Sequence, residues 1–231
     1  MPIGFSRVFQ GELTIIKEYA TAYSKILSAQ THPGLDHVYI DAFAGAGKCV
    51  SRATGEIISG SPLNALGVTP PFKAYHFIEL KPYKVESLRE ISANSPNVHL
   101  YEGDCNEILL KKVFPQVRFD KYQRALALLD PYGLHLNWEV IKAAADTRCI
   151  EIFLNFPVAD MNRNVFWNNP QNVDEQDIQR MNAFWGDASW REVAYETIPG
   201  LFGPMEVKST KRPPHFAIYS ADLYLFAHAS K

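Results

Sequence analysis

The sequence is poor in cysteine and has no long apolar run. Its three cysteines, Cys49, Cys105 and Cys149, are scattered along 231 residues. This number and spacing exclude a disulfide framework and a cysteine-based zinc site, and they favour a reducing compartment. No apolar run approaches the roughly 18 residues of a membrane helix, and the first ten residues lack the charged-then-apolar layout of a signal peptide. We therefore expect a cytoplasmic protein.

The sequence also lacks an excess of either charge. It holds 23 Lys and Arg against 25 Asp and Glu, a net charge of −2. A global basic field for nucleic acid is therefore excluded, so any such binding needs a local patch. Hydrophobic residues make up 47% and charged residues 21% of the chain, which excludes disorder, collagen and coiled coil as descriptions of the whole. The length predicts a single domain over residues 1–231.

Five apolar segments alternate with helical stretches. The expected strands are residues 38–43, 74–80, 98–101, 124–129 and 149–156. The expected helices are residues 11–29, 84–91, 106–113 and 138–145, together with one that starts at Pro62 and has Ser61 as its N-cap. The alternation predicts an α/β fold with a doubly wound, mostly parallel sheet covered by helices on both faces.

The composition changes after the fifth expected strand. Residues 160–199 contain three of the four tryptophans, Trp167, Trp185 and Trp190. We expect an inserted, partly helical lid or recognition segment there, whose tryptophans serve in packing rather than as a platform for a base. Two β-rich pieces, residues 215–219 and 223–227, predict a hairpin or part of one sheet edge. The chain stops almost directly after the second piece, which suggests a missing C-terminal tail.

Acidic residues follow four successive expected strands. They are Asp41, Glu79, Asp104 and Asp130. Ligands of open α/β sheets bind outside the carboxyl ends of the strands. Four carboxylates at these positions exceed what folding requires, and they suit ligand hydroxyls, amines and cations.

The glycine turn after Asp41 does not match the phosphate-binding motifs. A P-loop ending at Gly47-Lys48 needs glycine at 42 and Ser or Thr at 49, where the chain has Ala42 and Cys49. The dinucleotide motif needs a small residue at Val50 and an acidic residue nearer than Glu79. S-adenosylmethionine (SAM), a nucleoside without phosphates, fits better: it needs a glycine turn, a carboxylate for the ribose, a polar group for adenine and an anion for its amino group.

Five segments together resemble a class I, Rossmann-like SAM-dependent methyltransferase. They are DAFAGAG, SGSPLNAL, FIELKP, EGDCNEIL and LLDPYG. Lys17, Tyr19, NFPVADMNRN (155–164) and FWGDASW (184–190) make the chain more closely similar to the three-Cys-motif partner (TcmP) protein family. The AGAG, GSPL and DPY elements are also similar to ribosomal RNA adenine-N6 methyltransferases of the RlmJ type.

The resemblance implies a role for each residue of the site. It places Asp41, Phe43, Gly45 and Gly47 around the methionine part of SAM, and Ser61 near the cofactor. It places Glu79 on the ribose and Asp104 on the adenine. The methyl-transfer site would consist of Asp130, Pro131 and Tyr132. Methyltransferases of adenine amino groups carry [DNS]-P-P-[YFW]. This chain has Asp-Pro-Tyr-Gly and lacks the second proline, which puts the acceptor and the activity in question.

The predicted function is SAM-dependent methylation of an amino group, on an unpaired base of nucleic acid. The expected phosphate contacts are Arg163, Lys208, Lys211 and Arg212, unless these form only a solvated face. One alternative is a catalytically inactive SAM-binding or partner subunit of a defence or mobile-element system; another is a metal-dependent nuclease built on the carboxylates. Cys49 and Cys105 are expected to be buried thiols without a catalytic role.

Overall fold

The computed structural model describes residues 7–8, 10–51, 53–200, 203–209 and 224–227. Their contacts divide the chain into two compact units. Unit 1 comprises the described residues of Met1–Leu129, Ala143–Phe153 and Phe226–Lys231, and unit 2 those of Asp130–Lys142 and Leu154–Leu225. The expectation of a single domain with an insert at residues 160–199 stays a prediction.

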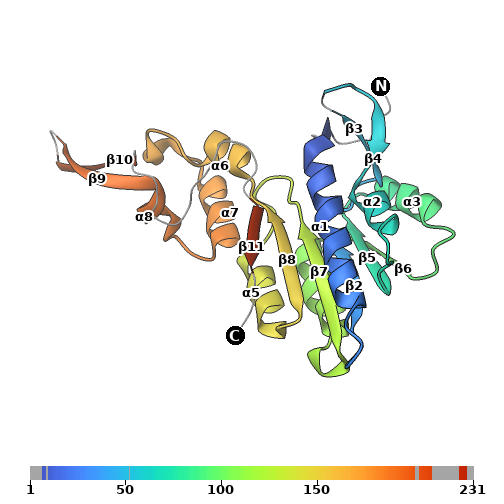
Figure 1. Ribbon diagram of the computed structural model, residues 1–231. Helices are drawn as coiled ribbons and strands as arrows, with labels where there is room; N and C mark the ends of the chain where they lie inside the picture. Colours follow the sequence, from blue (N-terminus) through green and yellow to red (C-terminus); the bar gives the residue numbers. More distant parts are fainter. Residues whose placement is uncertain (1–6, 9, 52, 201–202, 210–223, 228–231) are drawn as a thin grey trace. The chain divides into compact units, whose positions relative to one another are not determined.

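The main sheet has the strand order β11-β8-β7-β2-β5-β6 (Figure 1). Its strands are β2 (Asp36–Asp41), β5 (Ala74–Glu79), β6 (Val98–Glu102), β7 (Gln123–Leu129), β8 (Ile150–Asn155) and β11 (Tyr224–Ala227). Strand β2 pairs in parallel with β5 and β7, and β5 pairs in parallel with β6. Counted along the chain, the first five strands stand in the order 3-2-1-4-5, which is that of a doubly wound Rossmann-like sheet. The predicted fold class is therefore confirmed.

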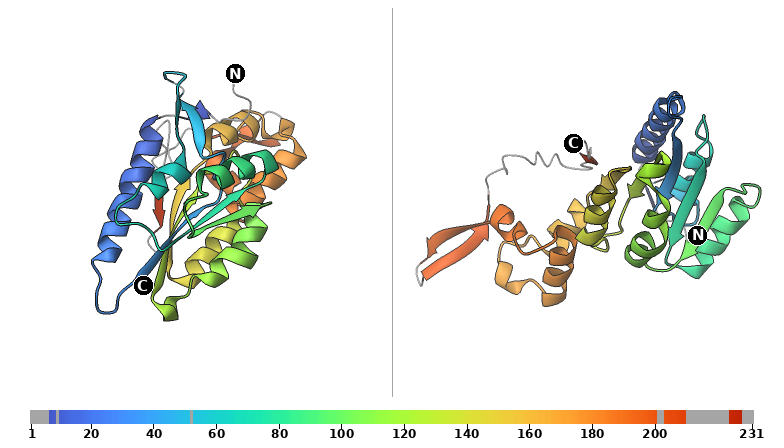
Figure 2. Two further views of the ribbon diagram at one scale, coloured as in Figure 1. Left: turned by 90° about the vertical axis from the view of Figure 1, so that its right-hand side faces the viewer. Right: turned by 90° about the horizontal axis from the view of Figure 1, so that it is seen from below.

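Helices flank this sheet. They are α1 (Gln10–Ser28), α2 (Ser61–Leu66), α3 (Pro82–Ile91), α4 (Cys105–Ile108) continued by the helical turns Leu109–Val113 and Phe114–Gln116, the turn Phe119–Lys121, and α5 (Trp138–Thr147). In unit 1, α1 lies on one face of the sheet and α4 with its following turns on the other (Figure 2). The buried positions of α1, such as Ile16, Ala20 and Tyr23, recur every three or four residues and form its apolar stripe.

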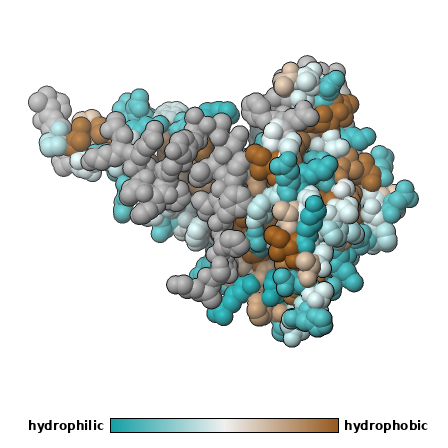
Figure 3. All heavy atoms as spheres, viewed as in Figure 1, coloured by the Kyte–Doolittle hydropathy of each residue, from teal (hydrophilic) through white to brown (hydrophobic). Residues whose placement is uncertain are grey.

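The central strands are buried on both faces. Tyr39 and Ile40 of β2 are fully buried, as is the stretch from Ala125 to Leu129 in β7. This explains the unbroken apolar runs of the sequence, because helices cover both sides of a parallel sheet. Outside, on the face of unit 1 that Figure 3 shows, hydrophobic side chains are scattered among polar ones.

The sequence analysis missed a small sheet, which consists of a strand before α1 and a hairpin between β2 and α2. Strand β1 (Arg7–Val8) pairs in parallel with β3 (Lys48–Ser51), which forms an antiparallel hairpin with β4 (Ile57–Ser59). These strands are too short to produce a clear pattern in the sequence. The prediction of Ser61 as N-cap was also wrong: Gly60 is the N-cap and Ser61 is the first helical residue. The Gly60 N–H donates to the carbonyl of Gly47 (2.9 Å), which holds Gly60 extended at the start of α2.

Beside the first residues of α5, the described part of unit 2 contains three helices, a helical turn and an antiparallel hairpin. These are α6 (Val158–Asn164), the turn Pro170–Asn172, α7 (Glu175–Trp185), α8 (Trp190–Ala194), β9 (Tyr195–Gly200) and β10 (Gly203–Lys208). Met161, Met181 and Trp190 are buried at its core. The Nε1 of Trp190 donates to Asn182 Oδ1 (2.7 Å), so the one polar atom of this buried indole is satisfied. For Trp190 the expected packing role is confirmed.

The C-terminal expectation is confirmed in part. Tyr224–Ala227 forms β11 at the edge of the main sheet, as predicted for residues 223–227. The other β-rich piece, residues 215–219, lies outside the described residues. In the described part of the chain, no helix has both the length and the apolar character of a membrane span.

Candidate functional site

The glycine turn follows β2 directly. Asp41, the last residue of β2, is fully buried, and its Oδ1 accepts a hydrogen bond from the N–H of Phe43 (3.2 Å). Gly45 and Gly47 have φ values of +64° and +74°, which favour glycine. A Cβ at Gly47 would lie 2.0 Å from Cδ1 of Ile91, whereas a Cβ at Gly45 would meet no atom within 4 Å. The backbone at Gly45 is therefore open to close approach by a ligand.

The end of β5 and the start of α2 lie beside this turn. The N–H of Ala44 donates to the carbonyl of Ile78 (3.0 Å), one residue before the end of β5. The bond between Gly60 and Gly47 described above brings the start of α2 to the turn as well. Ser61 and Phe43 are both half-buried. Four segments that the sequence analysis assigned to the cofactor site thus converge: the end of β2, the glycine turn, the start of α2 and the end of β5.

Glu79 and Asp104 extend this edge to the next strand. Glu79 ends β5 and pairs in register with Glu102 of β6. The N–H of Gly103 donates to the carbonyl of Glu79 (3.1 Å), and Asp104 follows at the start of α4. Because β2, β5 and β6 are neighbours and parallel, the carboxylates of Asp41, Glu79 and Asp104 lie along one edge of the sheet.

Each of these carboxylates also forms a local turn. Glu79 Oε1 accepts from the N–H of Lys81 (2.8 Å), and its Oε2 lies 3.8 Å from Nζ of Lys84. The exposed Asp104 accepts from the N–H of Asn106 (2.7 Å) and caps α4. These bonds fix the direction of the Glu79 and Asp104 carboxylates, and a carboxylate has about four lone-pair sites, more than these bonds use.

The predicted methyl-transfer residues form a loop at the start of unit 2. Asp130 is half-buried, and its Oδ1 accepts from Nδ2 of Asn155 (2.8 Å). Pro131 is buried, while Tyr132 is 90% exposed. Gly133 has a φ of +77°, so the loop turns at a residue suited to glycine.

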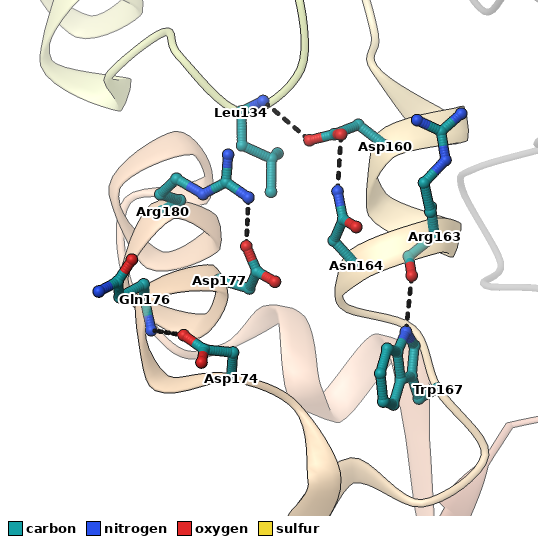
Figure 4. A network of polar contacts seen from close by, with 9 residues as sticks. All are labelled: Leu134, Asp160, Arg163, Asn164, Trp167, Asp174, Gln176, Asp177 and Arg180. Carbon is teal, nitrogen blue, oxygen red and sulfur yellow. Dashed lines mark hydrogen bonds and ion pairs between the residues drawn. The ribbon is translucent and has the colours of Figure 1, made fainter.

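Asp160 of α6 holds the backbone directly after this loop (Figure 4). Its Oδ2 accepts from the N–H of Leu134 (3.2 Å), and its Oδ1 accepts from Nδ2 of Asn164 (2.8 Å). The sequence analysis gave Asp160 and Asn155 no role. Two signals were available: both lie within NFPVADMNRN, one of the segments that carry the family resemblance, and Asn155 lies near the carboxyl end of the fifth expected strand.

Two of the four predicted phosphate contacts can be placed. Arg163 and Lys208 are both exposed, on α6 and β10. Lys208 Nζ donates to the carbonyl of Phe166 (3.0 Å), and the indole N–H of Trp167, 44% exposed, donates to the carbonyl of Arg163 (2.7 Å). The Lys208 ammonium and the backbone of Arg163 thus both contact the segment that carries Trp167. Lys211 and Arg212 lie outside the described residues, and a phosphate-binding patch stays a prediction.

The cysteines are buried thiols, as expected. Burial raises the pKa of Cys49 to about 11 and, with the charge of Asp104 adding to it, that of Cys105 to about 12. Neither is a thiolate near neutral pH, so neither is a ready nucleophile. Among the residues that the structure describes, no group of three His, Cys, Asp or Glu side chains is arranged to hold a metal ion.

Two further features of α1 lie outside the predicted cofactor site. Tyr19, part of the family resemblance, donates its hydroxyl to Glu151 of β8 and packs against Phe153, so it anchors α1. A groove runs along α1 where it faces β4 and α2, and Lys17 is among its lining residues. Those lining residues include none of the predicted cofactor residues, so we do not assign the groove to the cofactor.

Comparison with known proteins gives distant structural similarity only. No family model and no curated protein matches the sequence. A protein of Legionella pneumophila has a TM-score of 0.46 at 15% identity, over 74% of this chain and 73% of its own. The 23S rRNA methyltransferase ErmE has 0.38 at 15% identity, over 90% of this chain and 71% of its own. M. jannaschii TYW2, solved in complex with AdoMet, has 0.33 at 15% identity, over 83% of this chain and 66% of its own. Sequence identities and TM-scores this low do not support assigning the activity of any of these proteins to this chain.

Proposed function

We propose that this protein is a SAM-dependent methyltransferase that acts on an amino group of a nucleic-acid base. The observation that carries the proposal is the row of Asp41, Glu79 and Asp104 along one edge of a Rossmann-like sheet, beside a glycine turn without a phosphate motif. The donor set suits a nucleoside that has hydroxyl and amino groups and no phosphate. The open space at Gly45 allows close approach to the backbone.

In this proposal the residues of unit 1 bind the cofactor. Glu79 accepts hydrogen bonds from the ribose hydroxyls, and Asp104 accepts one from the adenine amino group. The turn of Asp41, Phe43, Gly45 and Gly47 holds the methionine part, with Ser61 nearby. SAM supplies an activated methyl group when bound, and the protein supplies binding and orientation.

The loop after β7 binds the acceptor. Asp130 accepts a hydrogen bond from the acceptor amine, and the Pro131 carbonyl accepts a second, so that the nitrogen lone pair is directed toward the methyl group. Asn155 holds the carboxylate of Asp130 in one orientation. The ring of Tyr132, almost fully exposed, stacks on the base.

The first test is calorimetric titration with SAM and S-adenosylhomocysteine. Binding should stabilise the protein by about 2.7 kcal/mol at 100 times the dissociation constant. Absence of both heat and a melting shift at millimolar ligand would remove the proposal.

The second test is methyl incorporation from labelled SAM into single-stranded and duplex RNA and DNA at two salt concentrations. Flipping a base out of a duplex costs a few kcal/mol, so single strands should be preferred. Arg163 and Lys208 predict weaker binding at higher salt. Tyr132→Ala should lower turnover, whereas Tyr132→Phe keeps the stacking ring and should retain it. SAM binding without transfer to any of the four substrates would instead favour a non-catalytic subunit.

A further inference from the structure

The loop of Asp130–Gly133 combines buried anchors with one outward side chain. Pro131 and Leu134 are buried, whereas Tyr132 between them is 90% exposed. Asn155 holds the first residue of the loop, and Asp160 holds the backbone just after it. Both anchors come from about 25 residues further along the chain and belong to unit 2.

The contact between Asp160 and the loop accounts for Gly133. A Cβ on Gly133 would lie 2.7 Å from Oδ2 of Asp160, which is closer than a Cβ normally comes to an atom that is not bonded to it. The φ of +77° is a second reason for glycine. The carboxylate therefore occupies the space beside the glycine while it accepts the N–H of Leu134. The glycine that separates this motif from the Asp-Pro-Pro-Tyr form is thus matched to a specific partner.

The carboxylate of Asp160 is itself fixed from below. Asn164, one helical turn later in α6, donates Nδ2 to Oδ1, which leaves Oδ2 directed at the loop (Figure 4). The loop backbone is thereby connected to α6, whose Met161 is buried in the core of unit 2, as is Val165 directly after the helix.

We propose that Asp160 is a positioning residue for methyl transfer, which holds the loop so that Asp130 and Tyr132 meet the acceptor in one geometry. This inference rests on the proposed function. Asp160 contacts backbone rather than substrate, so it acts through the loop. Misplacing a reacting group by about 1 Å can cost roughly 100-fold in rate, which sets the scale of the expected effect.

Three variants separate this role from a general loss of stability. Asp160→Ala removes the acceptor of the Leu134 N–H. Asp160→Asn keeps a side-chain oxygen for that N–H, and its NH₂ group can donate to the oxygen of a flipped Asn164 amide. Asp174→Ala is the matched control, because Asp174 of unit 2 also accepts a backbone N–H, from Gln176 (2.7 Å), without contact to the loop.

Methyl-transfer kcat should fall about 10- to 100-fold in Asp160→Ala, with SAM affinity unchanged. Asp160→Asn should stay within about 3-fold of wild type, and Asp174→Ala within about 2-fold. Amide hydrogen exchange gives a readout that does not need activity: the N–H of Leu134 should exchange faster in Asp160→Ala and as in wild type in Asp174→Ala.

Gly133→Ala tests the contact from the other side and covers the case in which Asp160→Ala does not fold. It should also lower kcat, and Asp160→Ala in the same chain should relieve part of its loss of stability. If Asp160→Ala has the wild-type kcat, or if the N–H of Leu134 exchanges at the wild-type rate in that variant, the role of Asp160 is overturned while the proposed function stands. A wild-type protein that binds no SAM would overturn the proposed function and this role with it.

Discussion

The carboxylates of unit 1 and the loop of unit 2 are held in different ways. Asp41, Glu79 and Asp104 each accept the backbone N–H of the residue two positions later. In unit 2, Asp130 accepts a hydrogen bond from the side chain of Asn155, and the N–H of Leu134 donates to the side chain of Asp160. These partners are 25 and 26 residues apart in the sequence. The first kind of contact forms wherever a strand ends in such a turn. The second kind requires that unit 2 has already folded.

This difference suggests that the two regions respond differently to mutation. In unit 1 each carboxylate is oriented by the local backbone turn that follows its strand. In unit 2 the position of the loop follows from the packing of α6 and its neighbours. Four predictions test that contrast, from the largest expected effect to the smallest.

Trp190→Ala should destabilise unit 2 by about 3–5 kcal/mol. The side chain is 1% exposed and packs against Phe166 and Tyr195, so its loss leaves a large cavity. The measurement is the free energy of unfolding in urea. Trp167→Ala is the control: that indole is 44% exposed and should cost less than about 1 kcal/mol. Equal losses in the two variants would contradict the assignment of Trp190 to the core.

Gly47→Ala should cost about 2–5 kcal/mol. The left-handed backbone accounts for roughly 1–2 kcal/mol, and the clash with Ile91 adds about 1–3 kcal/mol. Gly45→Ala has a similar φ and open space around it, so it should cost only the backbone part. Comparing the unfolding free energies of the two variants isolates the packing contribution. If Gly45→Ala were the more destabilising variant, the close packing at Gly47 would be disproved.

Acid should destabilise unit 1 through His76. Burial, and then the neighbouring His99, lower the pKa of His76 from 6.5 to about 4 in the folded protein. Between these values the unfolded chain binds more protons, so this stability is present above pH 6.5 and is lost as pH falls toward 4. The loss should reach about 3 kcal/mol. Urea unfolding at several pH values measures it.

His76→Gln should flatten this dependence and leave a smaller slope from His37, whose pKa burial also lowers. The exposed His135 of unit 2 provides the matched control, because His135→Gln should leave the slope in place. An unchanged slope in His76→Gln would show that other groups cause the acid sensitivity.

Glu79→Ala should weaken SAM binding about 10- to 100-fold, because hydrogen bonds to charged groups contribute roughly 1.5–3 kcal/mol. Asp130→Ala should leave SAM affinity nearly unchanged, since the loop is proposed to hold the acceptor. Calorimetric titration of both variants, with circular dichroism to verify folding, makes the comparison. Equal weakening in two folded variants would refute the division of roles between the two regions.

The elements that the sequence predicted are those with long or regular patterns. The alternation of apolar strands and amphipathic helices predicted the main sheet, and the polar residues after each strand predicted which side chains share its edge. The hairpin of β3 and β4 was missed because strands of four and three residues carry little pattern. The cap of α2 was misassigned because a contact between Gly60 and Gly47, distant in sequence, decides where the helix begins.

The sequence by itself determined the order of the strands along the chain and the carboxylates that follow them, because period and turn chemistry are local properties. Only the tertiary structure decided which residues hold the Asp-Pro-Tyr-Gly loop. Nothing near Gly133 in the sequence indicates that the carboxylate of Asp160 lies against it. The contact arises when α6 packs into the core of unit 2, and the geometry of the proposed acceptor site depends on that packing.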